Sequence, residues 1–116
     1  MPAQSSSLAK VTVNYRWSDG AHFNHEYYGS KHMEIAEQLL RPLGVIRLES
    51  NRTVLEKTPK PGTVIASSTV YFPSVALAQA AVAKAGAALL ADVPNYSNIR
   101  PELHVSEVAV HYESAA

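Results

Sequence analysis

Segments with the hydrophobic period of a strand and segments with the period of a helix follow one another in a definite order along this chain. This order constrains the fold more than any other feature of the sequence. Apolar residues alternate with polar ones from Val11 to Trp17, which is the period of a β-strand. Apolar residues then recur at helical spacing from Tyr28 to Leu43, after Asn24 as a predicted N-cap. Further strands are predicted at 45–56, 63–72 and 102–112, and a second helix is predicted at 76–85, with Ser74 as its cap, a break or bend at Gly86, and a helical piece at 87–91.

This order is β-α-β-β-α-β, which predicts a ferredoxin-like α+β fold with both helices on one face of a four-stranded sheet. The length of 116 residues fits one domain. We expect this domain to span residues 9–113 and to follow a disordered N-terminal tail, residues 1–8.

The third predicted strand indicates a partner subunit. Ile65 and Tyr71 share one parity in this strand, whereas Val64, Val70 and Phe72 share the other. Helices cover only one face of the sheet, so the other apolar face needs a second sheet, and the economical source is another copy of the chain. We therefore expect a homodimer with an interface of roughly 2,000 Å² or more.

The last predicted strand changes phase along its length. Leu103 and Val105 point to one face, whereas Val108 and Val110 point to the other. A one-residue slip flips every side chain, so the change predicts a bulge near residues 106–107, or a switch of the strand toward the partner.

Composition excludes several classes of function. Ten basic and ten acidic residues give a net charge of zero, so there is no broad positive field for nucleic acid. The chain has no cysteine, which rules out disulfides and thiolate metal sites. We see no membrane-spanning run and no signal peptide, and we expect a cytoplasmic protein. Phosphate-loop, Rossmann and G-x-S-x-G motifs are absent and no histidine set has metal-ligand spacing, so we expect neither cofactor nor metal.

His32 is the strongest candidate for a catalytic or ligand-binding residue. It lies one turn after Tyr28, on the helical stripe that we expect to face the sheet. Histidine titrates near neutral pH and can give or take a proton, and the tyrosine could hydrogen-bond the same ligand. The alternative is a structural histidine whose ring is satisfied by a backbone carbonyl at the edge of the core.

Two further segments could complete a pocket with His32. Ser67, Ser68 and Thr69 stand where a tightly filled strand has bulky residues. Small residues beneath a helix can leave a cavity lined by hydroxyls. The alternative is that the helix packs closer to the strand. We take Ser67 and Thr69 as ligand-binding candidates. The polar turn at 92–98 is expected to act as a lid with Tyr96 folded over the opening, although turn residues also gather this way without function.

Two motifs give the chain a family resemblance. The segment Phe23-Asn-His-Glu-Tyr-Tyr-Gly-Ser-Lys-His-Met33 resembles the helix-1 signature of the EthD family. Ala91-Asp-Val-Pro-Asn-Tyr-Ser-Asn-Ile99 resembles its second signature, and the likeness covers roughly residues 10–108. The resemblance implies an EthD-like domain that forms a dimeric α+β barrel. By motif match, it implies these pocket residues: Tyr27, Tyr28, His32 and Tyr96.

Three positions depart from the family pattern. Glu34 follows the methionine where many members have proline, and Asn14 stands where an apolar residue is usual. Thr69 lies near the position where many members carry a histidine on the third strand. The missing imidazole argues against an acid–base mechanism that uses two histidines.

The resemblance also implies a functional context. The family is named for ethyl tert-butyl ether degradation, where such a protein accompanies a cytochrome P450 system, and members are sometimes labelled oxidoreductases in a generic way. Similar barrels include lactone isomerases, polyketide cyclases and cofactor-free monooxygenases. One hypothesis is therefore a binding or accessory protein that holds a small organic compound during catabolism. The other is a cofactor-free isomerase, cyclase or oxidoreductase in which His32 is the acid or base and Tyr28 or Tyr96 polarises an oxygen.

Overall fold

The structure of the protein is a computed structural model that describes residues 8–115 of the chain. Its elements follow the predicted β-α-β-β-α-β order. Residues 1–7 of the expected tail lie outside the described residues. In chain order the elements are β1 (Ala9–Arg16), α1 (His25–Tyr27), η2 (Tyr28–His32), α2 (Met33–Leu40), η3 (Arg41–Leu43), β2 (Arg47–Arg52), β3 (Val64–Phe72), α3 (Val75–Asp92), η4 (Val93–Asn95) and β4 (Glu102–Glu107).

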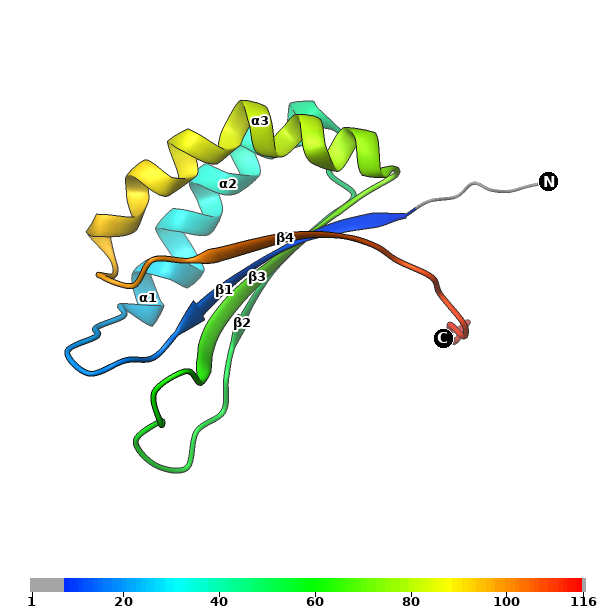
Figure 1. Ribbon diagram of the computed structural model, residues 1–116. Coiled ribbons are helices and arrows are strands. Elements are labelled where there is room, and N and C mark those ends of the chain that lie inside the picture. The colour runs from blue at the N-terminus through cyan, green and yellow to red at the C-terminus, as the bar shows by residue number, and fades with distance from the viewer. Residues whose placement is uncertain (1–7, 116) are drawn as a thin grey trace.

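The four strands form one antiparallel sheet in the order β2-β3-β1-β4. Figure 1 shows that the helices lie together on one face of this sheet. This arrangement confirms the predicted α+β class, with β1 and β3 at the centre and β2 and β4 at the edges. Cross-strand partners share a face, so the pairs Val11 with Val70 and Val13 with Ser68 place these four side chains toward the helices.

The first helical segment begins at Asn24, as predicted, because the Asn24 side chain accepts a hydrogen bond from the Tyr27 backbone N–H. Its buried residues recur at intervals of four: Tyr28, His32, Ala36 and Leu40. On an ideal α-helix, residues four positions apart are rotated by about 40° relative to each other around the helix axis. The wider π-helical turn of η2, which the sequence analysis did not anticipate, reduces that rotation between the first two of these residues.

Helix α3 begins at the predicted cap, since Ser74 Oγ accepts from the Leu77 N–H at 3.1 Å. Of the two alternatives expected at Gly86, a break or a bend, the break is wrong, because α3 runs unbroken to Asp92. A glycine inside a helix costs only about 1 kcal/mol relative to alanine, which packing can offset. Among residues 8–115, the segment Val75–Asn95 is long and apolar enough to cross a membrane, contrary to the sequence expectation. Here α3 forms an outer layer over the sheet, as helices do in soluble domains (Figure 1).

The apolar residues on the sheet face away from the helices are not the ones that strict alternation predicted. The register between β1 and β3 shifts between Tyr15 and Arg16. Ile65 accordingly joins the buried cluster that contains Tyr15, instead of lying on the open face with Tyr71. Val64 pairs with Arg16 and lies on the open face in place of Ile65, and the remaining open-face positions of the central strands are polar: Lys10, Thr12, Asn14, Arg16, Ser67 and Thr69.

Strand β4 ends where the sequence changes phase. Its pairing with β1 is regular from Glu102 to Glu107, so the expected bulge is not present. The strand stops there, well short of the predicted residue 112. Beyond it, the chain leaves the sheet on the side away from the helices, and Val110 and Tyr112 are exposed (Figure 1).

Two clusters of buried residues lie beneath the helices. The apolar cluster comprises Ala9, Val11, Ala36, Leu40, Val70, Phe72, Ala78, Ala81 and Ala85. The tyrosine cluster comprises Tyr15, Tyr28, Ile65, Ala66, Val93, Tyr96 and Ile99.

Candidate functional site

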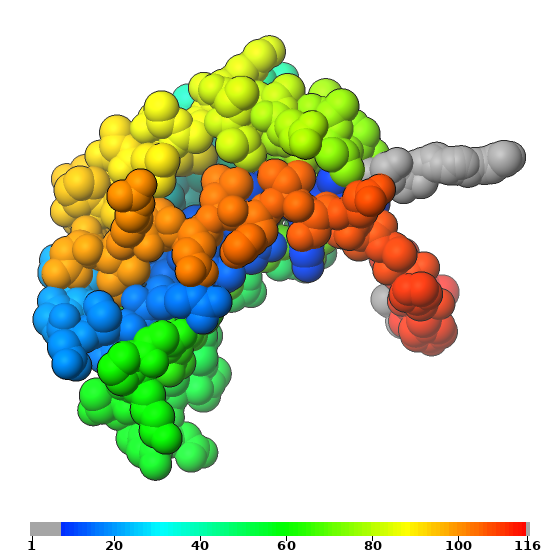
Figure 2. Space-filling model, in the orientation of Figure 1, coloured from blue at the N-terminus to red at the C-terminus, as the bar shows by residue number. Residues whose placement is uncertain are grey.

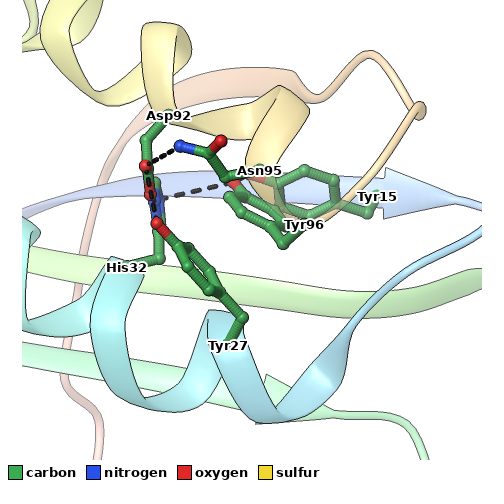
Figure 3. A network of polar contacts seen from close by, with 6 residues as sticks. All are labelled: Tyr15, Tyr27, His32, Asp92, Asn95 and Tyr96. Atoms are coloured by element: carbon green, nitrogen blue, oxygen red, sulfur yellow. Dashed lines mark hydrogen bonds and ion pairs between the residues drawn. The ribbon is translucent and has the colours of Figure 1, made fainter.

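A chain of hydrogen bonds joins the end of α3 to β1 through both sequence motifs (Figure 3). His32 Nδ1 lies 2.9 Å from Asp92 Oδ2. His32 Nε2 lies 3.4 Å from the Tyr96 hydroxyl, which is in turn hydrogen-bonded to the Tyr15 hydroxyl. All four side chains are buried, so their polar atoms must find partners within the protein.

Asp92 anchors this chain at the last residue of α3. Its Oδ1 accepts hydrogen bonds from the Tyr27 hydroxyl at 2.9 Å and from Asn95 Nδ2 at 2.8 Å. Burial opposes ionisation, but the hydrogen bonds from Asn95, His32 and Tyr27 outweigh it and lower the pKa of Asp92. Asp92 is therefore a carboxylate at neutral pH.

The Asp92 carboxylate fixes the tautomer of a neutral His32 ring. A carboxylate only accepts, so Nδ1 must carry the proton and donate it, which leaves the Nε2 lone pair facing Tyr96. The Nε2–hydroxyl distance of 3.4 Å is long compared with the usual range of about 2.7–3.2 Å. Nε2 is consequently the ring nitrogen for which a ligand can compete.

The tyrosines around His32 remain protonated. Burial raises the pKa of Tyr15, Tyr28 and Tyr96 alike. Each hydroxyl therefore keeps its proton at neutral pH and can donate it in a hydrogen bond. Tyr28 is stacked on the His32 ring. Within the described residues its buried hydroxyl makes no hydrogen bond of full geometry, although burial, which raises the pKa of Tyr28, is partly offset by the Ser68 side chain nearby.

His32 lies on the wall of a cavity between the helices and the sheet. The cavity has a volume of about 210 Å³. Its lining is mostly apolar and includes Val11, Leu40, Phe72 and Ala85. The polar lining side chains are Tyr15, His32, Ser68 and Arg100. An apolar space with a few convergent polar groups is the usual form of a small-molecule site.

The structure brings together most of the residues that the motifs predicted. His32 and Tyr96 are in contact, Tyr28 stacks on His32, and Tyr27 binds Asp92. Of these residues only His32 lines the cavity, whereas Tyr27, Tyr28 and Tyr96 contact Asp92 or His32 from outside its lining. The expected backbone carbonyl partner of His32 is instead the Asp92 carboxylate.

Ser67 and Thr69 do not lie beneath the first helix, so that part of the prediction is wrong. They pair with Asn14 and Thr12 on the open face of the sheet. The intervening Ser68 faces the helices and lines the cavity. The sequence correctly indicated a small hydroxylated strand, but the two residues chosen as ligand-binding candidates lie on its other face.

The turn after α3 is also not a lid over an opening. Tyr96 is only 1% exposed and belongs to the tyrosine cluster. Its carbonyl accepts from the Asn24 N–H at 2.7 Å, and Ser97 Oγ donates to the His22 carbonyl at 2.8 Å. These bonds hold the turn against the start of the first helix, where Tyr96 forms part of the interior.

Sequence reasoning missed two members of the site, Asp92 and Tyr15. Asp92 was visible only as one residue of a polar turn, and Tyr15 only as one apolar position of β1. One signal could have revealed Asp92: an acidic residue at a helix C-terminus opposes the helix dipole and needs a local reason. Among the residues that the structure describes, no group of three His, Asp or Glu side chains is placed to hold a metal ion.

Solved structures provide the only informative comparison. No protein-family model matches the chain, and no curated protein does either. An EthD-like protein from Ralstonia eutropha JMP134 is similar, with a TM-score of 0.75 and 28% identity over 93% of this chain and 97% of that protein.

Two more distant likenesses concern the fold alone. An EthD family protein from Bacillus halodurans C-125, whose description refers to ethyl tert-butyl ether, has a TM-score of 0.63 and 16% identity, over 88% of this chain and 99% of that one. A Bacteroides thetaiotaomicron protein of unknown function, described as a possible oxidoreductase, has a TM-score of 0.52 and 13% identity, over 90% of this chain and 100% of that one. The two motifs, the shared fold and the near full-length match to the Ralstonia protein together confirm the resemblance of this chain to the EthD family.

Proposed function

We propose that the protein binds a small, largely apolar organic molecule in the cavity beside His32. The observation that carries this proposal is the cavity itself, because apolar walls and a hydrogen-bonding end meet in one space between the helices and the sheet. An engineered cavity of about 150 Å³ is known to bind benzene. A space of about 210 Å³ therefore suits a single ring or a short branched chain. In line with the EthD resemblance, such a role belongs to the catabolism of organic compounds, alongside a cytochrome P450 system.

Filling the cavity tests this function without touching its polar groups. Ala85 is buried on the inner face of α3 and lines the cavity, whereas Ala83 is exposed on the same helix. Ala85→Leu should remove binding of small ring compounds, observed as loss of ligand-induced NMR shifts, and Ala83→Leu should leave those shifts intact. Equal binding by both variants would place the ligand elsewhere and end the proposal.

A second candidate function, cofactor-free acid–base catalysis, is supported by the Asp92–His32 pair. The carboxylate orients the ring and holds the proton on Nδ1, so that the Nε2 lone pair is available as a general base. A substrate oxygen or acidic C–H near Nε2 would exchange its proton with His32, and Tyr96 would donate to a developing oxyanion. Isomerase or cyclase chemistry of this kind needs the same cavity, whereas oxidoreductase chemistry would need an external oxidant, such as dioxygen, in addition to the proton transfer.

Asp92→Asn distinguishes catalysis from simple binding. An asparagine can present its N–H₂ group to His32 Nδ1 and so favour the opposite tautomer, with the proton on Nε2. If the protein is an enzyme, turnover of a lactone or ketone panel should collapse in this variant while ligand affinity changes little. Unchanged turnover in both Asp92→Asn and His32→Ala would exclude catalysis by His32, and binding would then be the one remaining function.

We also propose that the protein works as a cytoplasmic homodimer. Val54 on the β2–β3 loop and Tyr112 beyond β4 are 92% and 85% exposed. Both segments extend on the side of the sheet away from the helices (Figure 1). A second copy seated on this face would cover them, and the lack of cysteine suits a reducing compartment. Light scattering that shows a stable monomer at micromolar concentration would exclude the dimer.

A further inference from the structure

The cavity opens between α3 and the edge strand β4. Most of its lining residues are buried or half-buried, but three are exposed: Leu90 on α3, Arg100 before β4, and Leu103 on β4. Figure 2 views the molecule from this side, with α3 and β4 next to each other. His32 and Ser68, by contrast, are buried. The cavity therefore has a buried polar end and an exposed mouth.

Arg100 is the only permanently charged side chain among the described residues that line the cavity, and no carboxylate lines it. The arginine side chains at 16, 41 and 47 each bind a glutamate. In the described part of the chain, the Arg100 guanidinium has no such partner. An arginine keeps its charge at every physiological pH and presents a planar fork of donors that matches a carboxylate.

The buried end of the cavity is unsuited to a second negative charge. Asp92 is already ionised behind His32, and the pKa of that carboxyl is held low. An anionic group placed against His32 would be repelled by this carboxylate in a poorly screened interior. A negatively charged ligand group is therefore directed to the mouth, where Arg100 and solvent can stabilise it.

We propose that the ligand is a small organic acid, bound with its carboxylate on Arg100 and its apolar body in the cavity. The inference rests on the proposed binding function and adds the chemical class of the ligand. Leu90 and Leu103 pack on the body at the rim, and the far end of the ligand reaches the hydrogen-bonding groups around His32. Arg100 is thereby the residue that selects acids over neutral molecules of the same shape.

Pairs of acids and their amides test this assignment, because the two members differ in charge and hardly in size. The probes are benzoate and benzamide, cyclohexanecarboxylate and its amide, and pivalate and pivalamide, with ethyl tert-butyl ether as a neutral reference. Affinities are measured by NMR titration of the full-length protein. At least one acid should bind about tenfold more tightly than its amide, as expected for a charge-assisted hydrogen bond.

Variants of Arg100 complete the experiment. Arg100 is exposed, so Arg100→Gln should fold normally, and it should lose the preference for the acid while keeping the affinity for the amide. Arg41→Gln is the control, because Arg41 is an exposed arginine of η3 that lies outside the cavity and pairs with Glu37. That control should keep the preference. Added salt should weaken binding of the acid more than binding of the amide.

The possible failures are distinguishable. If acid and amide bind equally in the wild type and in Arg100→Gln, and Ala85→Leu abolishes both, the cavity binds neutral molecules and the inference is wrong while the proposed function stands. If the acid binds but Ala85→Leu leaves it bound, Arg100 is an isolated surface site and the inference is also wrong. If no probe binds at millimolar concentration, both the inference and the proposed function fail.

Discussion

The two buried clusters beneath the helices use their space in opposite ways. Alanine supplies five of the nine members of the apolar cluster, and the cavity lies against it. In the tyrosine cluster, large rings fill the interior through edge-to-face contacts, and hydrogen bonds run from the Tyr15 hydroxyl to the Tyr96 hydroxyl and from there to His32. The first cluster supplies room, and the second supplies polar groups held in fixed positions. Neither would make a site alone, so the boundary between them is where a ligand gains both burial and orientation.

The largest effect on stability should come from removing the main side chain of the apolar cluster. Phe72 is fully buried and lines the cavity. We expect the neighbouring side chains not to fill the space that its ring leaves, so the cavity becomes larger. Phe72→Ala should lower the free energy of unfolding by about 3–5 kcal/mol, measured by urea denaturation. Leu103→Ala, at a 44% exposed position of the same cavity wall, is the control and should cost far less. Similar losses would mean that this region is loosely packed throughout.

In the tyrosine cluster, the largest loss should follow from removing Asp92. Asp92→Ala leaves Tyr27, His32 and Asn95 without their shared acceptor. We expect a loss of about 1–3 kcal/mol in the free energy of unfolding. Glu37→Ala breaks an exposed ion pair on α2 and should cost no more than about 0.5 kcal/mol. Comparable losses in the two variants would show that the buried network contributes little.

The same carboxylate should make stability fall in acid. Its pKa is lower in the folded protein than in the unfolded chain, so the unfolded state binds the proton more tightly. The stabilisation is complete above the ordinary Asp pKa of about 3.9 and disappears as the pH falls through the lower folded value. Unfolding free energies measured from pH 7 to pH 2 should therefore drop more steeply in the wild type than in Asp92→Asn. Parallel curves would contradict the proposed stabilisation.

Two tyrosines of the tyrosine cluster should respond differently to loss of the hydroxyl. Tyr96→Phe breaks the bonds to Tyr15 and His32 and should cost about 1 kcal/mol. Tyr28→Phe removes a buried hydroxyl that makes no hydrogen bond of full geometry and has only Ser68 as a polar neighbour, so it should cost less than Tyr96→Phe. Thermal unfolding of the pair gives the comparison directly. A loss in Tyr28→Phe as large as that in Tyr96→Phe would indicate a further partner for that hydroxyl in solution, such as a buried water.

The sequence predicted the parts of this site that depend on strong local patterns. Asn24 and Ser74 cap the helices as expected, and the motif residues His32 and Tyr96 meet. It could not predict which face of β3 lines the cavity. That strand has small polar residues on both parities, so its alternation does not define a face, and the register shift near Ile65 moves an apolar residue to the helix side. The role of Asp92 could not be predicted without knowing that α3 continues through Gly86. Only an unbroken helix brings this carboxylate to His32.

The smallest effect should come from the two serines that the sequence could not assign to a face. Ser68 lines the cavity and Ser67 lies on the open face, and each change removes one hydroxyl oxygen. Ser67→Ala should shift the free energy of unfolding by no more than about 0.5 kcal/mol. Ser68→Ala should change stability little as well, but it should alter the affinity of a cavity ligand several-fold, because a polar contact inside the cavity is lost. NMR titration of both variants with the tightest probe separates the two faces. A change in Ser67→Ala alone would place the ligand on the open face of the sheet, where a partner subunit would have to complete its site.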